Sequence, residues 1–222
     1  MSDLTPSDGI AVVTGAGSGL GQALAVELAQ QGFVVAGLGR RAEALEQTRT
    51  LAPRGQFHPY VADVGVPREV EATFARLRTD HGAIALLINN AAVYPRRDFL
   101  DESGTSFAET MAANLGGVVS CTRAALEDMC RSGRGRILNV ATFADLNPLP
   151  ASSAYSVSKG AARILTRALI ADLADRFPGI IISDWMPGML RTSMGIPDGV
   201  APETSARWGA ALARQMDSSL MG

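Results

Sequence analysis

Tyr155 and Lys159 lie four residues apart in the segment AYSVSKGA, and Lys159 is the single lysine among 20 basic residues. Residues i and i+4 share one face of an α-helix, so this spacing brings a phenol and an ammonium group together. A cation about 4 Å from the phenol, at an effective dielectric constant near 20, lowers a tyrosine pKa by at most roughly three units, to near 7. The pair could therefore exchange a proton with a substrate at neutral pH. A solvated helix face is the alternative interpretation.

A glycine-rich turn, TGAGSGLG, spans residues 14–21 and follows the apolar segment IAVVT. Glycine lets the backbone turn tightly and approach a ligand closely. The helix that follows such a turn offers its N-terminal N–H groups and the positive end of its dipole to a phosphate. The turn favours dinucleotide binding, although the strict G-x-G-x-x-G spacing is absent. A plain corner between strand and helix is the alternative.

Short apolar segments alternate with helix-period segments along the whole chain. IAVVT, FVVAGL, FHPYVA, ALLIN, RILNVA and GIIIS are predicted strands, and most have the continuous apolar character of strands buried on both faces. Helices are expected over 20–31, 41–51, 67–81, 103–131 with a break, 153–177 and 202–216. The pattern predicts an α/β fold: a single Rossmann-like domain over 1–222, with a doubly wound parallel sheet and helices on both faces.

The composition is that of an ordinary globular protein, with 222 residues, 47% of them hydrophobic, 19% charged and a net charge of −2. We expect no nucleic-acid binding, because the arginines are scattered among 22 acids. The N-terminal segment has no signal-peptide pattern, and glycines interrupt the one long uncharged run, so we expect a cytoplasmic protein that does not span a membrane.

The cysteines and histidines indicate no disulfide and no metal site. Cys121 and Cys130 are nine residues apart in one predicted helix, which places them on opposite faces. His58 and His81 lack the spacing of metal ligands, so structural roles are expected for both.

Four motifs, in order, resemble the short-chain dehydrogenase/reductase family: TGxxxGxG at 14–21, NNAA at 89–92, Asn114, and YSVSK at 155–159. The resemblance covers residues 9–195, with a cofactor half over about 9–92 and a catalytic half over about 93–195. It implies hydride transfer between a nicotinamide cofactor and a carbonyl or secondary alcohol. It also implies Tyr155 as the acid/base, Lys159 as its partner, Asn114 as the holder of a proton-relay water, and Thr142 in place of the family's serine.

The resemblance further implies which residues bind the cofactor. They come from the glycine-rich turn, the ends of the second and third strands, the NNAA and YSVSK motifs, and the segment PGMLRT: Thr14, Gly15, Ser18, Gly19, Leu20, Gly21, Arg40, Arg41, Asp63, Val64, Asn90, Ala91, Tyr155, Lys159, Pro187, Gly188, Leu190 and Thr192. Gly39 stands where NAD-preferring members carry an acid, and an arginine after it accommodates a 2′-phosphate. We therefore predict NADP(H) over NAD(H), the alternative being an arginine pair at a helix start.

Three departures from the family pattern carry expectations of their own. Thr142 keeps a hydroxyl but adds a methyl and a restricted χ1, which predicts a tighter pocket. Ala92 replaces a glycine, which matters only if its φ must be positive. Many relatives continue to a seventh strand, so the edge strand is expected to be absent or stunted here. We expect a homodimer through helices 103–131 and 153–177, and the tetramer that uses that edge is in doubt.

The substrate mouth is expected from loops 93–99, 143–150 and 189–200, with a substrate-loop and helical tail over about 188–222. Arg96 and Arg97 could meet an acidic or acyl-carrier substrate, or could simply be solvated. A sensor module of the same fold that binds NAD(P) without turnover is the second functional class. Intact Tyr155 and Lys159 favour the enzyme.

Overall fold

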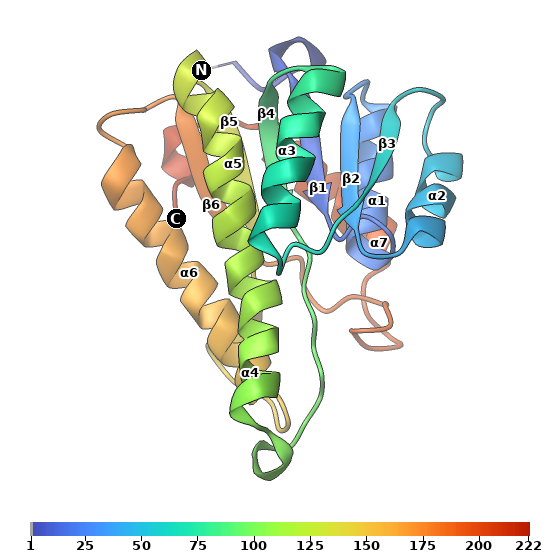
Figure 1. The fold of residues 1–222 in the computed structure, drawn as a ribbon, viewed down its shortest axis with the longest axis vertical. Coiled ribbons are helices and arrows are strands. Elements are labelled where there is room, and N and C mark those ends of the chain that lie inside the picture. Colours follow the sequence, from blue (N-terminus) through green and yellow to red (C-terminus); the bar gives the residue numbers. More distant parts are fainter. Residues whose placement is uncertain (1) are drawn as a thin grey trace.

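Six parallel strands form one sheet in the order β3-β2-β1-β4-β5-β6 (Figure 1). The computed structural model describes residues 2–222. The order reverses between β1 and β4, which places the topological switch point at the carboxyl ends of these two strands. The doubly wound, six-stranded sheet expected from the sequence is confirmed. The strands are β1 Ile10–Thr14, β2 Val35–Gly39, β3 Phe57–Val61, β4 Ile84–Asn89, β5 Gly135–Val140 and β6 Ile180–Trp185.

Helices cover both faces of this sheet (Figure 1). On one face pack α1 (Gly19–Gln30) and α7 (Pro202–Arg214). The other face holds α3 (Pro67–His81), α5 (Gly117–Ser132) and α6 (Ser153–Leu173). The helix α2 (Ala42–Leu51) packs beside β3 and α1, and its Leu45 belongs to the same core as α1 and α7. Each face therefore has its own apolar core, and the strands between them are buried on both sides.

The burial of the strands follows their sequences. Every residue of β1 and β4 is buried, as their unbroken apolar runs predict. The edge strand β3 is buried only at Phe57 and Tyr60, and it carries Pro59, a residue confined to edges because it cannot donate to a ladder. The carboxyl ends of the fully buried central strands β1 and β4 therefore meet at one edge of the sheet.

The long helix predicted over 103–131 is interrupted, as expected. It consists of α4 (Gly104–Met111), a π-helical turn over Ala112–Gly116, and α5. The extra residue of a π turn commonly marks a functional position, and Asn114 lies within this one. Two helices end earlier than predicted: α6 at Leu173 and α7 at Arg214.

Beyond α7 the chain returns to the edge of the sheet without adding a strand. Residues 218–220 form a 3-10 turn, and the Gly222 N–H donates to the Ile182 carbonyl of β6 at 3.2 Å. Among residues 2–222, the sheet therefore has six strands and one terminal hydrogen bond on its β6 edge.

Other expectations can be checked against the described part of the chain. Both cysteines are free, as predicted. Ala151 is the one non-glycine residue with a positive φ among residues 2–222, so Ala92 tolerates its methyl. No helix in that range has both the length and the apolar character that crossing a bilayer requires. No cluster of three potential metal ligands occurs there either.

Candidate active site

The glycine-rich turn and the NNAA segment form one hydrogen-bonded unit at the switch point. Gly15 and Gly19 adopt φ of +69° and +54°, which other residues rarely adopt. A Cβ on Gly21 would lie 2.2 Å from the Gly15 oxygen, so α1 can approach the turn only without a side chain there. The Thr14 hydroxyl accepts from the N–H groups of Asn90 and Ala91, both at 3.0 Å.

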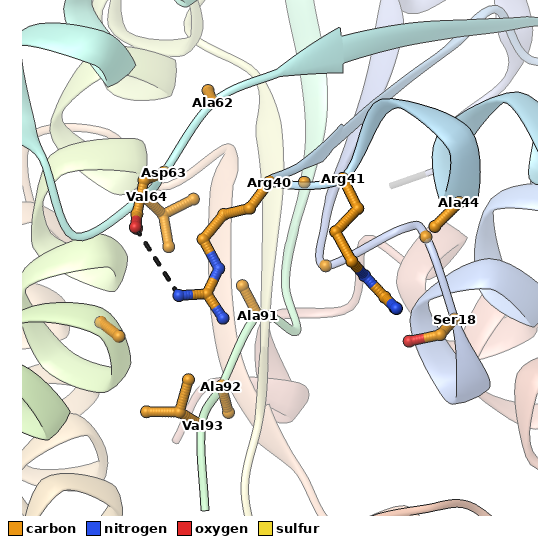
Figure 2. Close-up of a pocket in the computed structure, with 14 residues that line it drawn as sticks. Ser18, Arg40, Arg41, Ala44, Ala62, Asp63, Val64, Ala91, Ala92 and Val93 are labelled. Atoms are coloured by element: carbon orange, nitrogen blue, oxygen red, sulfur yellow. Dashed lines mark ion pairs between the residues drawn. The ribbon is translucent and has the colours of Figure 1, made fainter.

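A cavity of about 170 Å³ opens beside this unit (Figure 2). Seven of the residues predicted to bind cofactor line it: Gly15, Ser18, Arg40, Arg41, Asp63, Val64 and Ala91. Its other lining residues are small or apolar and outside the quoted cofactor set: Gly17, Gly39, Ala44, Ala62, Ala92, Val93 and Ala113. From the sequence, Gly39, Ala92 and the 93–99 loop stand out, but no cofactor contact is predicted for any of these residues, because small and apolar side chains offer no group that bonds a ligand. Their position flanking the motifs was the only available signal.

The charge in this cavity is carried by three side chains. Arg40 Nη1 lies 3.8 Å from Asp63 Oδ2, with side-chain exposures of 64% and 36%. Figure 2 shows Arg41 extended toward Ser18, away from this pair. Asp63 is the only acid in the lining, and its Oδ1 accepts from the Gly65 N–H at 2.9 Å. An anionic ligand would therefore meet Arg40, which is weakly paired, and Arg41, which pairs with no carboxylate among residues 2–222.

The other residues predicted to bind the cofactor do not line this cavity. The Asn90 amide donates to the Thr14 carbonyl at 2.9 Å, so its side chain closes the turn instead of facing the cavity. Leu20 is buried in the core behind the turn. Thr192 Cγ2 lies 3.3 Å from where a Cβ on Gly19 would stand, which brings the 187–192 segment beside the turn. Ser205 Oγ fixes the start of that segment by donating to the Pro187 carbonyl.

Tyr155 and Lys159 lie one turn apart on α6, as predicted. The Tyr155 ring stacks on Tyr94, with centroids 4.4 Å apart and planes inclined by 19°. Lys159 is 6% exposed, and its Nζ donates to the Val140 carbonyl at the end of β5, at 2.8 Å. Burial lowers the pKa of Lys159 to about 8, with Asp184 and Asp145 acting in the opposite direction.

The pKa of Tyr155 shifts in the direction opposite to the sequence-based expectation. Burial of the phenol raises it, the Thr142 hydroxyl opposes that shift, and Tyr94 and Asp145 add to it. The expected decrease to near 7 required the Lys159 ammonium at the phenol. In the structure that ammonium is engaged by Val140, so Tyr155 is a protonated phenol at neutral pH.

Thr142 follows β5 and caps a 3-10 turn over Phe143–Asp145, where its hydroxyl accepts from the Ala144 N–H at 3.3 Å. The carboxylate of Asp145 is held by two nitrogens of Arg163 on α6, at 2.5 and 2.9 Å. The same guanidinium donates to the Thr142 carbonyl at 3.2 Å. Sequence reasoning missed this ion pair because its members are 18 residues apart and belong to no motif.

Asn114 is fully buried and ties the 93–98 loop to α6. Its Oδ1 accepts from the Val93 N–H at 2.7 Å, and its Nδ2 donates to the Val93 carbonyl at 2.9 Å. The second Nδ2 hydrogen reaches Ser158 Oγ on α6 at 3.0 Å. The side chain therefore fixes two elements that flank Tyr155.

The two arginines of the mouth differ. Arg97 pairs with Glu102 at 2.7 Å, and that carboxylate is almost completely buried. The Arg97 guanidinium is therefore held by this ion pair within its own loop. Arg96 lies over the Tyr94 ring, 5.3 Å from its centroid, and its Nη2 donates to the Met194 carbonyl at 3.1 Å. Arg96 thus joins the 93–98 loop to the 189–200 loop beside Tyr155.

Comparison with known proteins agrees with this geometry. The family model for short chain dehydrogenases matches residues 9–199. The chain is 36% identical over 199 residues to 2-(R)-hydroxypropyl-CoM dehydrogenase of Xanthobacter autotrophicus, covering 83% of this chain and 76% of the relative. It is 30% identical over 217 residues to farnesol dehydrogenase of Aedes aegypti, covering 95% and 86%.

Solved structures agree as well. A metagenomic short-chain oxidoreductase in complex with NADP superimposes with a TM-score of 0.83 at 27% identity, covering 96% of this chain and 93% of that one. A structure described as a β-ketoacyl-ACP reductase superimposes with a TM-score of 0.82 at 28% identity, covering 92% and 90%. The family match, the relatives, the six-stranded parallel sheet, the glycine-rich turn and the Tyr155–Lys159 pair agree with one another. This chain belongs to the short-chain dehydrogenase/reductase family of oxidoreductases.

Proposed function

We propose that the protein reduces a carbonyl compound with NADPH, or oxidises the matching secondary alcohol with NADP⁺, using Tyr155 as the proton donor or acceptor. The observation that carries this proposal is the protonated, half-buried Tyr155, which lies beside Thr142 on the same helix as Lys159. The cavity beside the glycine-rich turn opens at the same end of the sheet. When bound, NADP(H) supplies or accepts the hydride.

The cavity residues fit a dinucleotide with a 2′-phosphate. The turn is free of Cβ atoms at Gly15 and Gly19, and Arg41 and Ser18 face each other at the cavity edge (Figure 2). Phosphate is best met by arginine and by N–H or hydroxyl donors, which these residues provide. Arg40 could bind the 2′-phosphate only if it gave up its ion pair with Asp63 or shared its guanidinium between the two groups. The absence of an acid at Gly39 removes the partner that a free ribose 2′-hydroxyl would need.

The proton step follows from the local electrostatics. A raised pKa keeps the Tyr155 proton in place at neutral pH, so the phenol can donate it to the carbonyl oxygen as hydride adds to the carbonyl carbon. Thr142 offers a second hydroxyl to the same oxygen. Lys159 would stabilise the phenolate that remains, once its Nζ turns from Val140 toward Tyr155.

The loops around Tyr155 favour a substrate with an apolar body. Seven large apolar side chains are exposed on the two loops that follow β5 and β6: Phe143, Leu146, Leu149, Met186, Met189, Met194 and Ile196. Exposed apolar patches of this kind mark ligand grooves, and methionines adapt to varied shapes. Arg96, which joins the 93–98 loop to the 189–200 loop, is already bonded to the Met194 carbonyl, so we propose uncharged ketones or alcohols with alkyl or isoprenoid-like chains.

A panel of ketones and secondary alcohols tests this function. Each is mixed with NADPH or NADP⁺, and with NADH or NAD⁺, while the absorbance of the reduced nicotinamide is followed. We expect turnover with NADP(H), and a kcat/KM that rises with the length of the apolar chain. Tight NADPH binding without turnover of any compound would favour the sensor alternative. Equal kcat/KM for short polar and long apolar ketones would remove the proposed substrate class.

A further inference from the structure

Arg163 connects three parts of the catalytic half through one side chain. It projects from α6, one helical turn beyond Lys159 and two beyond Tyr155, so these residues follow one another along the same helix. Its guanidinium holds both oxygens of Asp145 and the carbonyl of Thr142. The bidentate pair is largely dry, with side-chain exposures of 17% for Arg163 and 1% for Asp145.

The turn that carries Thr142 rests directly on α6. A Cβ on Gly160 would lie 3.7 Å from Asp145 Cβ, so the helix offers a bare surface to Asp145, one residue after Lys159. The Thr142 hydroxyl accepts from the Ala144 N–H of that same turn at 3.3 Å and lies against the Tyr155 phenol. The position of this hydroxyl relative to Tyr155 therefore depends on how the 143–145 turn is held to α6.

The pair also sets the charge around the phenol. The groups that face Tyr155 and Lys159 are Tyr94 and Arg96 from the 93–98 loop, Asp145 from the turn, Arg163 from α6 and Asp184 from β6. Asp145 disfavours the Tyr155 phenolate, and Arg163 is the cation in direct contact with Asp145. Without Arg163, a buried carboxylate would remain unpaired beside the reacting oxygen, which is costly.

We propose that Arg163 is a positioning residue of the reaction, holding Thr142 in register with Tyr155 and neutralising Asp145 beside the phenol. This inference rests on the proposed function, because it assigns the residue an effect on the proton step. It predicts two separable consequences of losing the guanidinium. One is a slower reaction from a misplaced hydroxyl, and the other is a phenol that is harder to ionise.

The experiment compares the pH profile of alcohol oxidation for four proteins: the parent, Arg163→Met, Arg163→Lys, and Asp145→Asn combined with Arg163→Met. For Arg163→Met we expect kcat to fall about tenfold, within the range that a small misplacement of a catalytic group produces, and the apparent pKa to rise. Arg163→Lys keeps a positive charge but lacks the planar guanidinium that bonds both oxygens of Asp145. It should therefore keep the apparent pKa of the parent and only part of its kcat. The double variant should recover the pKa while kcat stays low.

Arg167→Met is the matched control, since Arg167 is exposed on the next turn of α6 and makes no hydrogen bond or ion pair among residues 2–222. Circular dichroism and NADPH affinity, both expected to be unchanged, show that each variant is folded. If Arg163→Met and Arg167→Met share the parent's kcat and apparent pKa, the inference is wrong. If the parent itself turns over no alcohol or ketone, the proposed function fails instead, which is a separate result.

Discussion

Positive charge is arranged in opposite ways at the two ends of the site. At the cofactor cavity, Arg40 is mostly exposed and lies 3.8 Å from its carboxylate, and Arg41 points to Ser18 (Figure 2). At the other end, Lys159 is buried and bonded to β5, and Arg163 is largely shielded from solvent and bonded to the 143–145 turn. An exposed pair contributes little to stability and can be recruited by a ligand, whereas buried pairs fix geometry because breaking them is costly. We therefore propose that charge serves cofactor binding at one end of the site and preorganisation at the other.

The largest effect should come from the phenol itself. Tyr155→Phe removes the proton donor but keeps the ring that stacks on Tyr94. We expect kcat to fall by about 10²–10⁴, the usual contribution of an acid/base group, while the Kd of NADPH changes little. Tyr94→Phe serves as the control and should keep most of the activity. A Tyr155→Phe variant with parental kcat would remove Tyr155 from the mechanism.

Exchanging the buried cation should have the next largest effect. Lys159→Arg keeps the charge but spreads it over a longer planar fork, which cannot occupy the same position against Val140 and also reach Tyr155. We expect kcat near neutral pH to fall at least about tenfold and the remaining rate to climb with pH. Steady-state rates across pH, with circular dichroism as the folding control, measure both. Identical pH profiles for the two proteins would mean that any cation suffices.

The exposed arginines should instead change affinity and leave kcat intact. Arg41→Ala should weaken NADPH binding by roughly tenfold, because a charge-assisted contact to phosphate contributes about 1.5–3 kcal/mol, and should leave NADH binding unchanged. Arg40→Ala should have a smaller effect, since Arg40 is already shared with Asp63. Titration calorimetry gives the dissociation constants, with Arg49→Ala on the exposed side of α2 as control. Equal Kd values for NADPH and NADH in the parent would contradict the proposed preference.

The smallest effect is expected on the free energy of unfolding, from a histidine pair that lies away from the site. His81 is partly buried against His58, with ring centroids 4.1 Å apart, and burial lowers its pKa, with His58 adding to the shift and Asp80 opposing it. The unfolded chain then binds the proton more readily, so stability present above about pH 6.5 is lost as pH falls through the lowered folded pKa.

Urea unfolding of the parent and of His81→Phe, between about pH 7 and pH 5, measures this loss. The free energy of unfolding of the parent should fall across that window, and that of His81→Phe should fall less. A steeper fall for the variant would show that the His58–His81 contact stabilises the charged form.

Sequence reasoning reached the fold because each signal was local. The unbroken apolar runs of β1 and β4 indicate strands buried on both faces, and the glycines at 14–21 indicate a tight turn. Because strands and helices alternate along the chain, a parallel sheet with a switch point follows. The Tyr155–Lys159 pair was predictable for the same reason, since one helical turn sets it. Contacts between distant segments were not predictable: Lys159 with Val140 and Asp145 with Arg163 depend on how a loop rests on α6.

The transfer of deuterium to a ketone, from NADPH that carries deuterium in place of both hydrogens at C4 of the nicotinamide, tests the central claim most directly. Parent protein and Tyr155→Phe are each incubated with labelled NADPH and a long-chain ketone, and the products are analysed by mass spectrometry. The account predicts an alcohol from the parent with deuterium on the former carbonyl carbon, and almost none from Tyr155→Phe although it binds NADPH equally well. An unlabelled alcohol from the parent, or equal labelled product from both proteins, would contradict it.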